Sequence, residues 1–589
     1  MNIDLRANPF FLTEEDCDWV HETIAAMNDE EKVGQLFFQL TSSQKEEDLI
    51  ELIQTYHLGG CRYNPAPARE VWKQNRILQE NSKIPLFIAC NTESGGDGAC
   101  TDGTYIGNGM KIGATGNHDY AEDMGRMGNA EAAAIGCNMA FAPVCDIYYN
   151  PMNTEISTRA FSNDPEMVKK CSVEYVRGAH QNTDFACVAK HFPGNGVDYR
   201  DAHLSNHVND FSPKHWDETY GMVYKELIEN GVEGIMGGHI MLPEYVRELA
   251  PELPEEEVWM PATLNKTLMT TLLRDKLGFQ GVVVTDASHM VAMTNQMTRK
   301  EMLPRAINAG CDMFLFFNDP QEDFQTMLTA YQRGVISEER MTEALTRILG
   351  IKARLQLHKK SAAEMVPEKD TLDRVLGNEE FKKKQSEISE KSLTLVKYKD
   401  KDVLPISPEK YKKVMIVHIK GHETGMVELL KLCGMEGKNP AETVKQKLCE
   451  RGYDAYVYES PLDQMKQKAL KGEKPDLNIY FAGKNAISEF REQADLVITL
   501  CDVMAGRPSF GMSKGGGEIP WYVFEVPVIA VGCGQPTMLS DIPQVRTYIN
   551  IYDAKENTLE KLIEALSSGA DAFVGKDPID SFCGLQDTK

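Results

Sequence analysis

Short apolar runs alternate with amphipathic stretches along the first 355 residues. The apolar runs that could form buried strands, the first of which could also be a buried helix end, are residues 33–40, 57–63, 86–90, 139–146, 187–191, 234–239, 281–286 and 313–317. Helical periodicity lies between them, for example over 119–136, 165–181 and 214–230. Near-continuous apolar strands that alternate with helices are typical of a parallel sheet buried on both faces. About eight such units in about 350 residues favour a closed (β/α)8 TIM-like barrel, with an open doubly wound sheet as the alternative.

A second series of strands begins after a change in composition. Residues 304–310 and 337–355 have the pattern of closing helices, so the barrel is expected to occupy residues 1–355. Residues 356–392 are rich in Lys, Glu and Ser, which predicts a linker with helical pieces. The strands expected after it are 393–398, 414–419, 455–458, 496–500, 528–531 and 548–552. They predict an αβα sandwich domain over residues 393–589, in which the Gly-rich piece 511–517 is a flexible loop rather than a phosphate cradle.

Composition narrows the class of protein and its partners. The chain has 589 residues, 42% hydrophobic and 26% charged, with a net charge of −25. This acidity disfavours nucleic acid and anionic membrane surfaces as partners. No apolar run approaches the length of a membrane span, and no secretory signal is evident at the start. The 14 cysteines include no CxxC pair and many lie in apolar runs, which predicts reduced thiols in a cytoplasmic protein. No spacing of metal ligands is present, and neither a metal nor a cofactor is expected. The sequence does not distinguish a monomer from a homodimer.

The loop from Lys190 to His203 holds the densest group of candidate catalytic side chains. It follows an apolar strand and contains Gly, Pro, one lysine, two histidines and two aspartates. A solvated polar loop is the simplest interpretation. However, Lys190 and His191 lie where a strand ends, which is where parallel barrels present their catalytic groups. Asp201 and His203 are two residues apart, so the carboxylate could orient the imidazole of an acid/base histidine. The glycines of this loop predict that it is mobile.

Other candidate strands also end in polar residues. These strand-end residues are Asn91 with Glu93, Asp146 followed by Arg159, His239 and Asp286. Each could be a structural capping residue or an ion-pair partner, but a series of them at one barrel mouth is better explained by a site. Hydrogen-bonding side chains around a carboxylate suit a polyol ligand.

Several pieces of the chain resemble glycoside hydrolase family 3, and within it the β-N-acetylglucosaminidases of the NagZ type. The similar pieces are Lys190–Gly196 ("KHFPGHG"), Asp201–His203 ("DSH"), Phe141–Asp146 ("FAPVxDV"), Thr158–Phe161 with Asp164 and Pro165 ("xRSFGxDP"), and Pro261–Leu264 with Leu277–Asp286 ("PATLS…LGFxGVVVTD"). The stretch after Ile84–Ala89 lies where the family has its acidic "DxEGG" loop, and Ser392–Val396 and Gly575–Asp580 resemble parts of the family's sandwich domain.

The resemblance implies a retaining exo-glycosidase that removes a β-linked N-acetylhexosamine through a covalent glycosyl-enzyme. Asp286 would be the nucleophile, and His203 backed by Asp201 would be the acid/base. The residues that would bind the sugar are Asn91, Asp146, Arg159, Lys190, His191, His239 and Met290.

The chain departs from the family pattern mostly around the sugar pocket. Asn91 replaces an aspartate, Ser94 interrupts Glu-Gly-Gly, and Asn195 replaces a histidine, while Asn206-His207 and Ala287 also differ. The sugar could therefore differ from N-acetylglucosamine. A β-glycoside phosphorylase, a family 3 β-glucosidase and a non-catalytic sugar-binding protein are the alternatives, the last disfavoured by the intact Asp286, Asp201 and His203.

Overall fold

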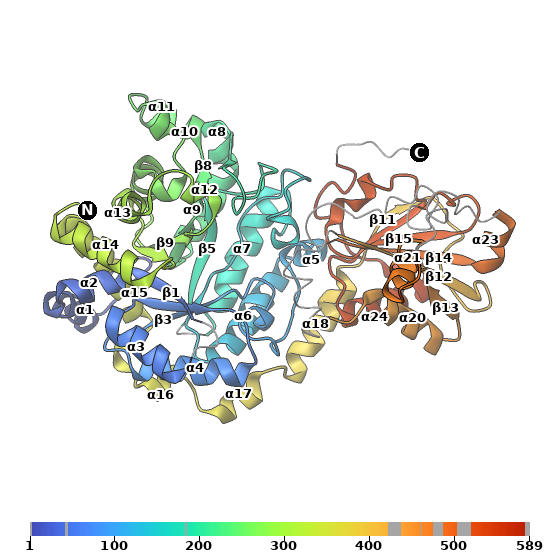
Figure 1. Cartoon of the computed structure of the whole chain (residues 1–589), viewed down its shortest axis with the longest axis horizontal. Helices are drawn as coiled ribbons and strands as arrows, with labels where there is room; N and C mark the ends of the chain where they lie inside the picture. The colour runs from blue at the N-terminus through green and yellow to red at the C-terminus, as the bar shows by residue number, and fades with distance from the viewer. Residues whose placement is uncertain are drawn as a thin grey trace. The chain divides into compact units, whose positions relative to one another are not determined.

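The first part of the chain folds as a closed barrel of parallel strands (Figure 1). The computed structural model describes residues 3–41, 45–182, 185–421, 437–459, 461–474, 487–503 and 520–583. The eight barrel strands are β1 (Phe37–Thr41), β2 (Gly60–Tyr63), β3 (Phe87–Cys90), β4 (Met139–Ala140), β5 (Ala186–Phe192), β7 (Gly234–Gly237), β9 (Val282–Ala287) and β10 (Met313–Leu315). Their order, β1-β10-β9-β7-β5-β4-β3-β2, closes on itself because β1 pairs with both β10 and β2. The predicted (β/α)8 barrel is confirmed, and the open sheet is excluded.

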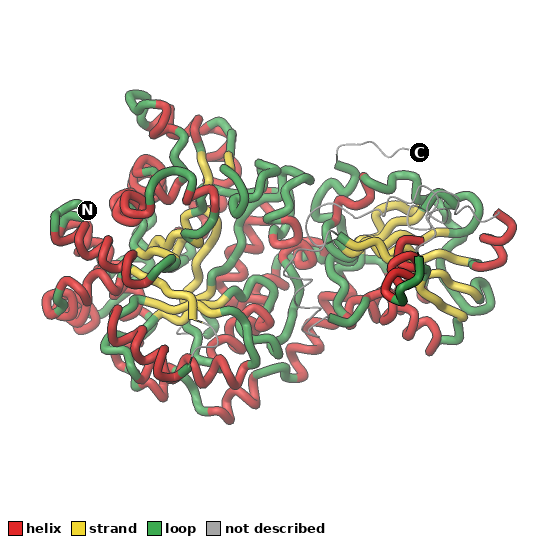
Figure 2. Tube along the Cα trace, in the orientation of Figure 1, coloured by secondary structure: helices red, strands yellow, loops and turns green. Residues whose placement is uncertain are grey.

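Helices surround the barrel strands, as Figure 2 shows in red around yellow. The longer ones are α1 (Glu14–Ala26), α2 (Asp29–Gln35), α3 (Glu46–Tyr56), α4 (Ala68–Glu80), α6 (Asp119–Ala134), α7 (Pro165–Ala179), α9 (Met222–Glu229), α13 (Arg299–Ala309), α14 (Pro320–Gln332) and α15 (Glu338–Arg354). Their starts follow local chemistry: Thr13 and Asn28 form capping boxes, and Asp164 caps α7 with Pro165 as its first residue.

Strand β4 is much shorter than the predicted strand over residues 139–146. Pro143 lacks a backbone N–H, so the ladder cannot continue through it. Val144 forms only an isolated parallel bridge with Lys190, and the amide of Cys145 donates to the Lys190 carbonyl at 2.9 Å. The chain therefore stays beside β5 as it leaves the sheet, which places Asp146 next to the start of the Lys190–His203 loop.

The second part of the chain contains a six-stranded sheet in the order β11-β16-β15-β14-β12-β13. The strands are β11 (Thr394–Tyr398), β12 (Lys413–Lys420), β13 (Asp454–Val457), β14 (Leu496–Asp502), β15 (Val528–Gly532) and β16 (Thr547–Asn550), of which only β11 pairs antiparallel. Along β12, Val414 and Ile416 belong to one hydrophobic cluster while Met415 and Val417 belong to another. Both faces of the sheet are therefore covered, as expected for an αβα sandwich.

The helices of the sandwich lie on both of these faces. They are α20 (Pro440–Glu450), α21 (Pro461–Leu470), α23 (Ile487–Gln493) and α24 (Glu556–Ser568). Side chains of α20 and α24 join the first cluster, and Phe490 of α23 joins the second. The Gly-rich stretch 511–517 lies outside the described residues. Among those that are described, no helix combines the length and apolar character needed to cross a membrane.

The chain divides into two compact units that are not simply consecutive. The first comprises residues 1–109 and 118–384, and the second residues 110–117 and 385–589. The expected linker contains α16 (Ala362–Met365), α17 (Lys369–Val375) and α18 (Glu379–Lys391), and most of it belongs to the barrel unit. The short segment that joins the sandwich unit lies in α5 (Gly109–Ala114) and just beyond it. Its Lys111 is buried and donates to Asp553, Thr558 and Ser389 at 2.6–3.0 Å.

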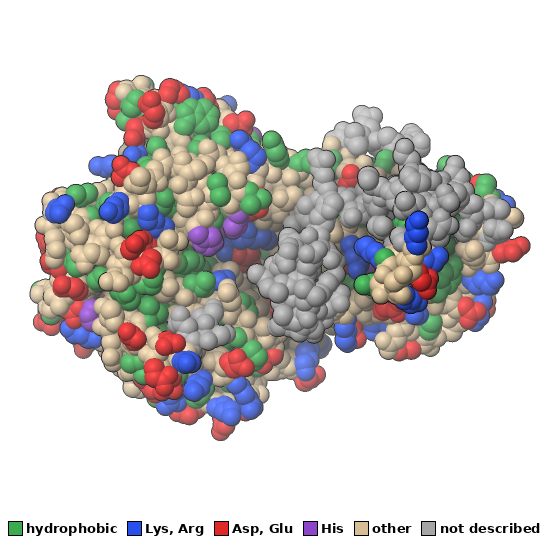
Figure 3. All heavy atoms as spheres, viewed as in Figure 1, with side chains coloured by type: hydrophobic (Ala, Val, Ile, Leu, Met, Phe, Trp, Pro, Cys, Tyr) green, Lys and Arg blue, Asp and Glu red, His purple; other side chains and the backbone are tan. Residues whose placement is uncertain are grey.

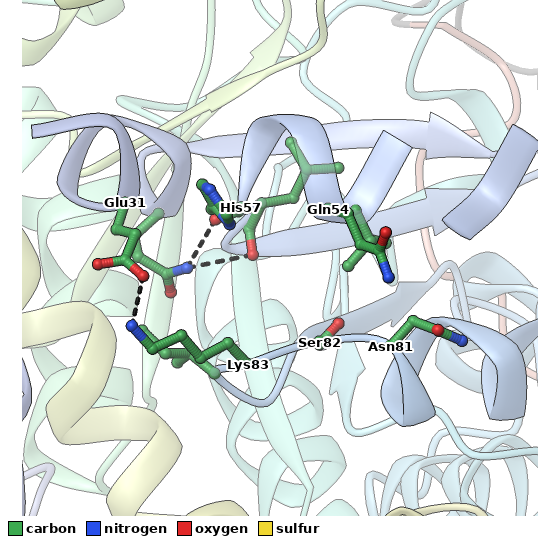
Figure 4. Close-up of a pocket in the computed structure, with 10 residues that line it drawn as sticks. Glu31, Gln54, His57, Asn81, Ser82 and Lys83 are labelled. Carbon is green, nitrogen blue, oxygen red and sulfur yellow. Dashed lines mark hydrogen bonds and ion pairs between the residues drawn. The ribbon is translucent and has the colours of Figure 1, made fainter. Parts of the chain in front are cut away.

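A polar network fills the floor of the barrel, at the end where the strands begin. A cavity of about 130 Å³ there is lined by Glu31, Gln35, His57 and Lys83, among others. Figure 4 shows Glu31 paired with Lys83, whose Nζ lies 2.5 Å from Glu31 Oε1. Gln35 donates to the carbonyls of residues 57 and 58 and accepts from Lys352 Nζ at 2.7 Å. This end of a barrel usually contributes stability rather than chemistry.

Lys352 is the most costly member of this network, so its removal is expected to stabilise the protein. Burial lowers the pKa of Lys352 to about 7, which corresponds to a penalty on the order of 4–5 kcal/mol. Leaving Gln35 without its donor costs about 1–3 kcal/mol. Lys352→Met should therefore raise the free energy of unfolding by about 2 kcal/mol at pH 7, as measured by urea unfolding followed by tryptophan fluorescence.

The gain should depend on pH with a definite sign. Between about pH 7 and pH 10 the unfolded chain protonates this lysine while the folded chain does not, so wild-type stability rises with pH. The advantage of Lys352→Met should thus shrink as the pH rises through this window. Lys300→Met, at an exposed lysine of α13, should change stability by less than about 0.5 kcal/mol. A variant that is less stable than wild type at pH 7 would contradict this account of the barrel floor.

Candidate active site

The carboxyl ends of the barrel strands bring together side chains that are far apart in the sequence. His191, near the end of β5, donates from Nδ1 to Asp146 Oδ2 at 2.7 Å, and its backbone N–H donates to Asp146 Oδ1 at 3.2 Å. Its Nε2 lies 3.9 Å from Asp286 Oδ2. The fully buried Asp146 thus orients the ring so that Nε2 points toward Asp286. Figure 3 shows histidine side chains beside a group of Lys and Arg side chains in a hollow on this face of the barrel unit.

Asp286 is held as an ionised carboxylate near the end of β9. Burial alone would raise its pKa, but the nearby His191 imidazole and a hydrogen bond from the backbone of Ala287 bring the pKa below the ordinary value. That bond, from Ala287 N to Asp286 Oδ1, is 2.7 Å long. The side chain is 17% exposed, so one edge of the carboxylate remains accessible from the mouth of the barrel.

Glu93 connects two of the predicted sugar-binding residues. Arg159 donates to both of its carboxylate oxygens, from Nε and Nη2, at 2.9 Å each. Lys190 Nζ lies 2.5 Å from Glu93 Oε1. Although burial opposes its ionisation, these two cations hold the pKa of Glu93 well below its usual range. The bidentate geometry fixes the plane of the Arg159 guanidinium. Because two cations share one carboxylate, the cluster of Glu93, Arg159 and Lys190 keeps an excess positive charge.

The Asp201–His203 pair predicted from the spacing forms a hydrogen-bonded dyad. His203 Nδ1 lies 2.8 Å from Asp201 Oδ1, and the backbone N–H of His203 donates to the same oxygen at 2.8 Å. This hydrogen bond raises the pKa of His203 despite partial burial. The imidazole is 52% exposed. A carboxylate on Nδ1 leaves Nε2 as the nitrogen that can exchange a proton with a ligand.

The dyad is docked on the segment that follows Asp286. The amides of Val291 and Ala292 donate to the carbonyls of His203 and Ala202, at 3.3 and 3.1 Å. Ala202, Met290 and Ala292 form a small buried cluster against which Ala287 packs. Met290 is therefore buried beneath the dyad, with 1% of its surface exposed. These contacts tie the position of His203 to that of Asp286.

The glycines of the loop serve close packing. Gly194 and Gly196 have φ values of 121° and 108°, and a Cβ on either would meet the Tyr220 ring or the Ile147 carbonyl. Asn195, which departs from the family pattern, is buried between them. Its backbone N–H donates to Asp146 Oδ1 at 2.7 Å, and its side-chain Oδ1 accepts from the Asn153 side chain and from the backbone N–H of Gly196. The positive φ values explain the glycines without requiring mobility.

His239 and Asn91 differ in how many partners they have. His239 Nε2 donates to the Ala287 carbonyl at 3.0 Å, so Nδ1 accepts from the Thr263 hydroxyl at 2.8 Å. Burial lowers the pKa of His239, in keeping with this neutral tautomer. Its two ring nitrogens are thus occupied within the protein. The side-chain amide of Asn91, just after β3, has no hydrogen-bond partner among the described residues and remains available to a ligand.

A closed parallel barrel with an ionised carboxylate, a histidine–carboxylate dyad and a fixed pair of cations at its strand ends has the organisation of a carbohydrate-active barrel enzyme. Comparison with known proteins gives the family. Residues 29–351 match the glycosyl hydrolase family 3 N-terminal domain. A β-N-acetylglucosaminidase/β-glucosidase of Cellulomonas fimi is 36% identical over 591 residues, covering 100% of both chains. The chain belongs to glycosyl hydrolase family 3 and is an enzyme of the glycoside hydrolase class.

Solved structures show the same two-part architecture. The chain is similar to a β-glucoside phosphorylase, BglX, with 33% identity, a TM-score of 0.87 and coverage of 99% of each chain. It also shares its fold with a family 3 β-N-acetylglucosaminidase from Paenibacillus sp. str. FPU-7, at 24% identity and a TM-score of 0.76, over 95% of this chain and 100% of that one. By sequence, the chain is also similar to a β-hexosaminidase A of Pseudoalteromonas piscicida, which is 28% identical over 61% of this chain and 62% of its own length.

Proposed function

We propose that this enzyme removes a terminal β-linked N-acetylhexosamine, in particular N-acetylglucosamine, by a retaining double displacement. The observation that carries the proposal is the docking of the Asp201–His203 dyad directly on the segment that follows the ionised Asp286. The proposed nucleophile and proton donor thereby lie on two segments that contact each other directly. The Cellulomonas relative is named a β-N-acetylglucosaminidase/β-glucosidase and the Pseudoalteromonas relative a β-hexosaminidase, which supports an N-acetylhexosamine as the sugar.

The proposed reaction has two steps. In the first, Asp286 attacks the anomeric carbon, the glycosidic C–O bond breaks, and His203 Nε2–H gives its proton to the departing oxygen. In the second, water attacks the glycosyl-enzyme and gives a proton to His203, while the bond to Asp286 breaks. The imidazole must therefore be protonated first and neutral next, which requires a pKa near the working pH.

We assign the surrounding residues to two tasks. Arg159 and Lys190 are proposed to donate hydrogen bonds to sugar hydroxyls, with Glu93 fixing both, and His191 is proposed to hydrogen-bond a hydroxyl through Nε2. Asp146, His239 and Met290, also expected to contact the sugar, are proposed to act through neighbours. Asp146 orients His191, His239 holds the backbone at Ala287, and Met290 supports the dyad.

Phosphorolysis is the second candidate function. The similarity to BglX covers 99% of both chains at 33% identity. Physically, an imidazole acid/base carries no negative charge, so it repels an incoming phosphate dianion less than a carboxylate would. The two functions are separated by product analysis in 50 mM phosphate and in a phosphate-free buffer. A sugar 1-phosphate as the main product would favour phosphorolysis, whereas free sugar in both buffers supports hydrolysis.

Asn91 is predicted to set recognition at the edge of the sugar. An ionised aspartate would accept two charge-assisted hydrogen bonds there, whereas asparagine offers one acceptor and one donor group. Asn91→Asp is therefore expected to change the ratio of kcat/KM values among aryl β-glycosides of GlcNAc, GalNAc, glucose and xylose by about tenfold. Asn230→Asp, at an exposed asparagine remote from the site, should leave the ratios unchanged. An unaltered ranking in Asn91→Asp would show that this position does not control specificity.

We also propose a cytoplasmic location. Eleven of the thirteen described cysteines are buried as free thiols, and burial raises the pKa of many of them, for example Cys61 to about 12. Such unreactive thiols are typical of a reducing compartment. Fractionation of the native host with an antibody against the protein tests the location.

A further inference from the structure

A second carboxylate lies beside the dyad, and the reaction proposed above does not use it. Glu155 comes from the long loop after β4, and its side chain is only 5% exposed. One polar atom each of Glu155, Asp201 and His203 lie within 4.8 Å of one another. Two carboxylates therefore surround one half-exposed imidazole, although a single carboxylate would be enough to orient it.

Glu155 holds the backbone of the dyad itself. Its Oε2 accepts the backbone N–H of Ala202, the residue between Asp201 and His203, at 3.1 Å. The carbonyl of Glu155 accepts from Arg159 Nη1 at 3.3 Å, and Arg159 in turn grips Glu93. Glu155 thereby connects the dyad, through its side chain, to Arg159, through its backbone carbonyl.

A buried histidine lies on the other side of Glu155. His207 Nδ1 lies 2.6 Å from the carbonyl of Arg200, so this nitrogen carries a hydrogen, and it lies 3.9 Å from Glu155 Oε2. The side chain of His207, one of the positions that depart from the family pattern, is fully buried. The backbone N–H of Ala202 and Nδ1 of His207 thus both lie near Oε2 of Glu155.

The charge of Glu155 acts in the same direction as that of Asp201. The charged or titratable groups that face His203 are Asp201, Glu155, Asp286 and His239. The hydrogen bond to Asp201 is the largest of the influences that raise the pKa of His203, and the charges of Glu155 and Asp286 add to it. In a partly buried site a charge about 5 Å away shifts such an equilibrium appreciably.

We propose that Glu155 is a positioning residue, which fixes the backbone between Asp201 and His203 and keeps the imidazole in its proton-donating form. This inference rests on the proposed role of His203 as acid/base. Glu155 thus places a second negative charge beside the dyad. Its effect on the rate should be largest for glycosides whose leaving group must be protonated.

The test compares pH profiles of kcat/KM for an alkyl glycoside, whose leaving group needs protonation. Glu155→Gln keeps an oxygen for the Ala202 amide but removes the charge. Its basic limb should move to lower pH by roughly 0.5–1 unit, while an activated aryl glycoside near pH 6 should be cleaved at a rate close to that of wild type. Glu155→Asp keeps the charge and should keep the wild-type limb even if its rate is lower. Glu248→Gln, an exposed control, should change neither.

The outcomes separate this inference from the function beneath it. In a His203→Ala background, Glu155→Gln should no longer move the limb, because the group through which it acts is gone. An unmoved limb in Glu155→Gln, or an equal displacement in Glu155→Asp, would overturn the positioning role. Should Glu155→Gln not fold, the Glu155→Asp profile decides alone, and a displaced limb overturns the inference. If His203→Ala itself affects alkyl and activated glycosides equally, the proposed acid/base has failed, not only Glu155.

Discussion

Replacement of Asp286 by asparagine is expected to lower kcat/KM by about four orders of magnitude or more on every aryl glycoside tested. Asparagine fills the same space at the end of β9 but cannot form the glycosyl ester, so the first step is lost while the barrel stays intact. Circular dichroism and thermal unfolding should remain close to wild type, because the side-chain oxygen of asparagine can still accept the hydrogen bond from the amide of Ala287.

The comparison needs a carboxylate that is not in the site. Asp275→Asn, at an exposed position of the barrel unit, should retain nearly full activity. If Asp286→Asn kept more than about one hundredth of wild-type activity on purified, correctly folded protein, the nucleophile would have to be another residue.

Loss of His203 is expected to separate substrates by the quality of their leaving group. His203→Ala should reduce kcat/KM for alkyl glycosides by about 10²–10⁴-fold, the usual contribution of a general acid, and far less for dinitrophenyl glycosides. The glycosyl-enzyme would then lack a base for water. Azide, which needs no base, should restore turnover on activated substrates and give a β-glycosyl azide.

Removal of the Asp201 carboxylate is expected to change the pH dependence of the reaction. Because Asp201 raises the pKa of His203, Asp201→Asn should lower that pKa and move the basic limb of the kcat/KM profile to lower pH. Activity at alkaline pH is therefore lost first. His21→Ala, at an exposed histidine of α1, serves as the control. Equal losses on good and poor leaving groups, with no azide rescue in His203→Ala, would assign the proton donor elsewhere.

Local signals were sufficient to predict the elements of the fold. The run Val282–Val284 is apolar at successive positions, which occurs where a strand is buried on both faces, and it forms β9. The same pattern predicted seven of the barrel strands and the six strands of the sandwich, whereas the run 33–40, left open as a strand or a helix end, contains the end of α2 and most of β1. The end of β4 was not predicted, because Ala142 and Val144 continue the apolar pattern while Pro143 removes the ladder donor.

Features that depend on distant residues were not predictable. Glu93 was visible in the sequence after β3, but its partners Arg159 and Lys190 come from two other strand ends, so only the closed barrel reveals the three-residue cluster. The resemblance of its surroundings to the family's acidic loop was the one available signal. Likewise, Lys111 has the same local pattern as any helical lysine, and its partner Asp553 is 442 positions away.

The central claim is that Asp286 forms a covalent bond to the sugar, and a mechanism-based label tests it most directly. Wild-type enzyme incubated with an activated 5-fluoro N-acetylglucosaminide, or with a 2-fluoro glucoside, should accumulate a glycosyl-enzyme of the expected added mass. After proteolysis, tandem mass spectrometry should place the sugar on Asp286, and Asp286→Asn should remain unlabelled under the same conditions. A sugar attached to another carboxylate, such as Glu93 or Glu155, would contradict the account.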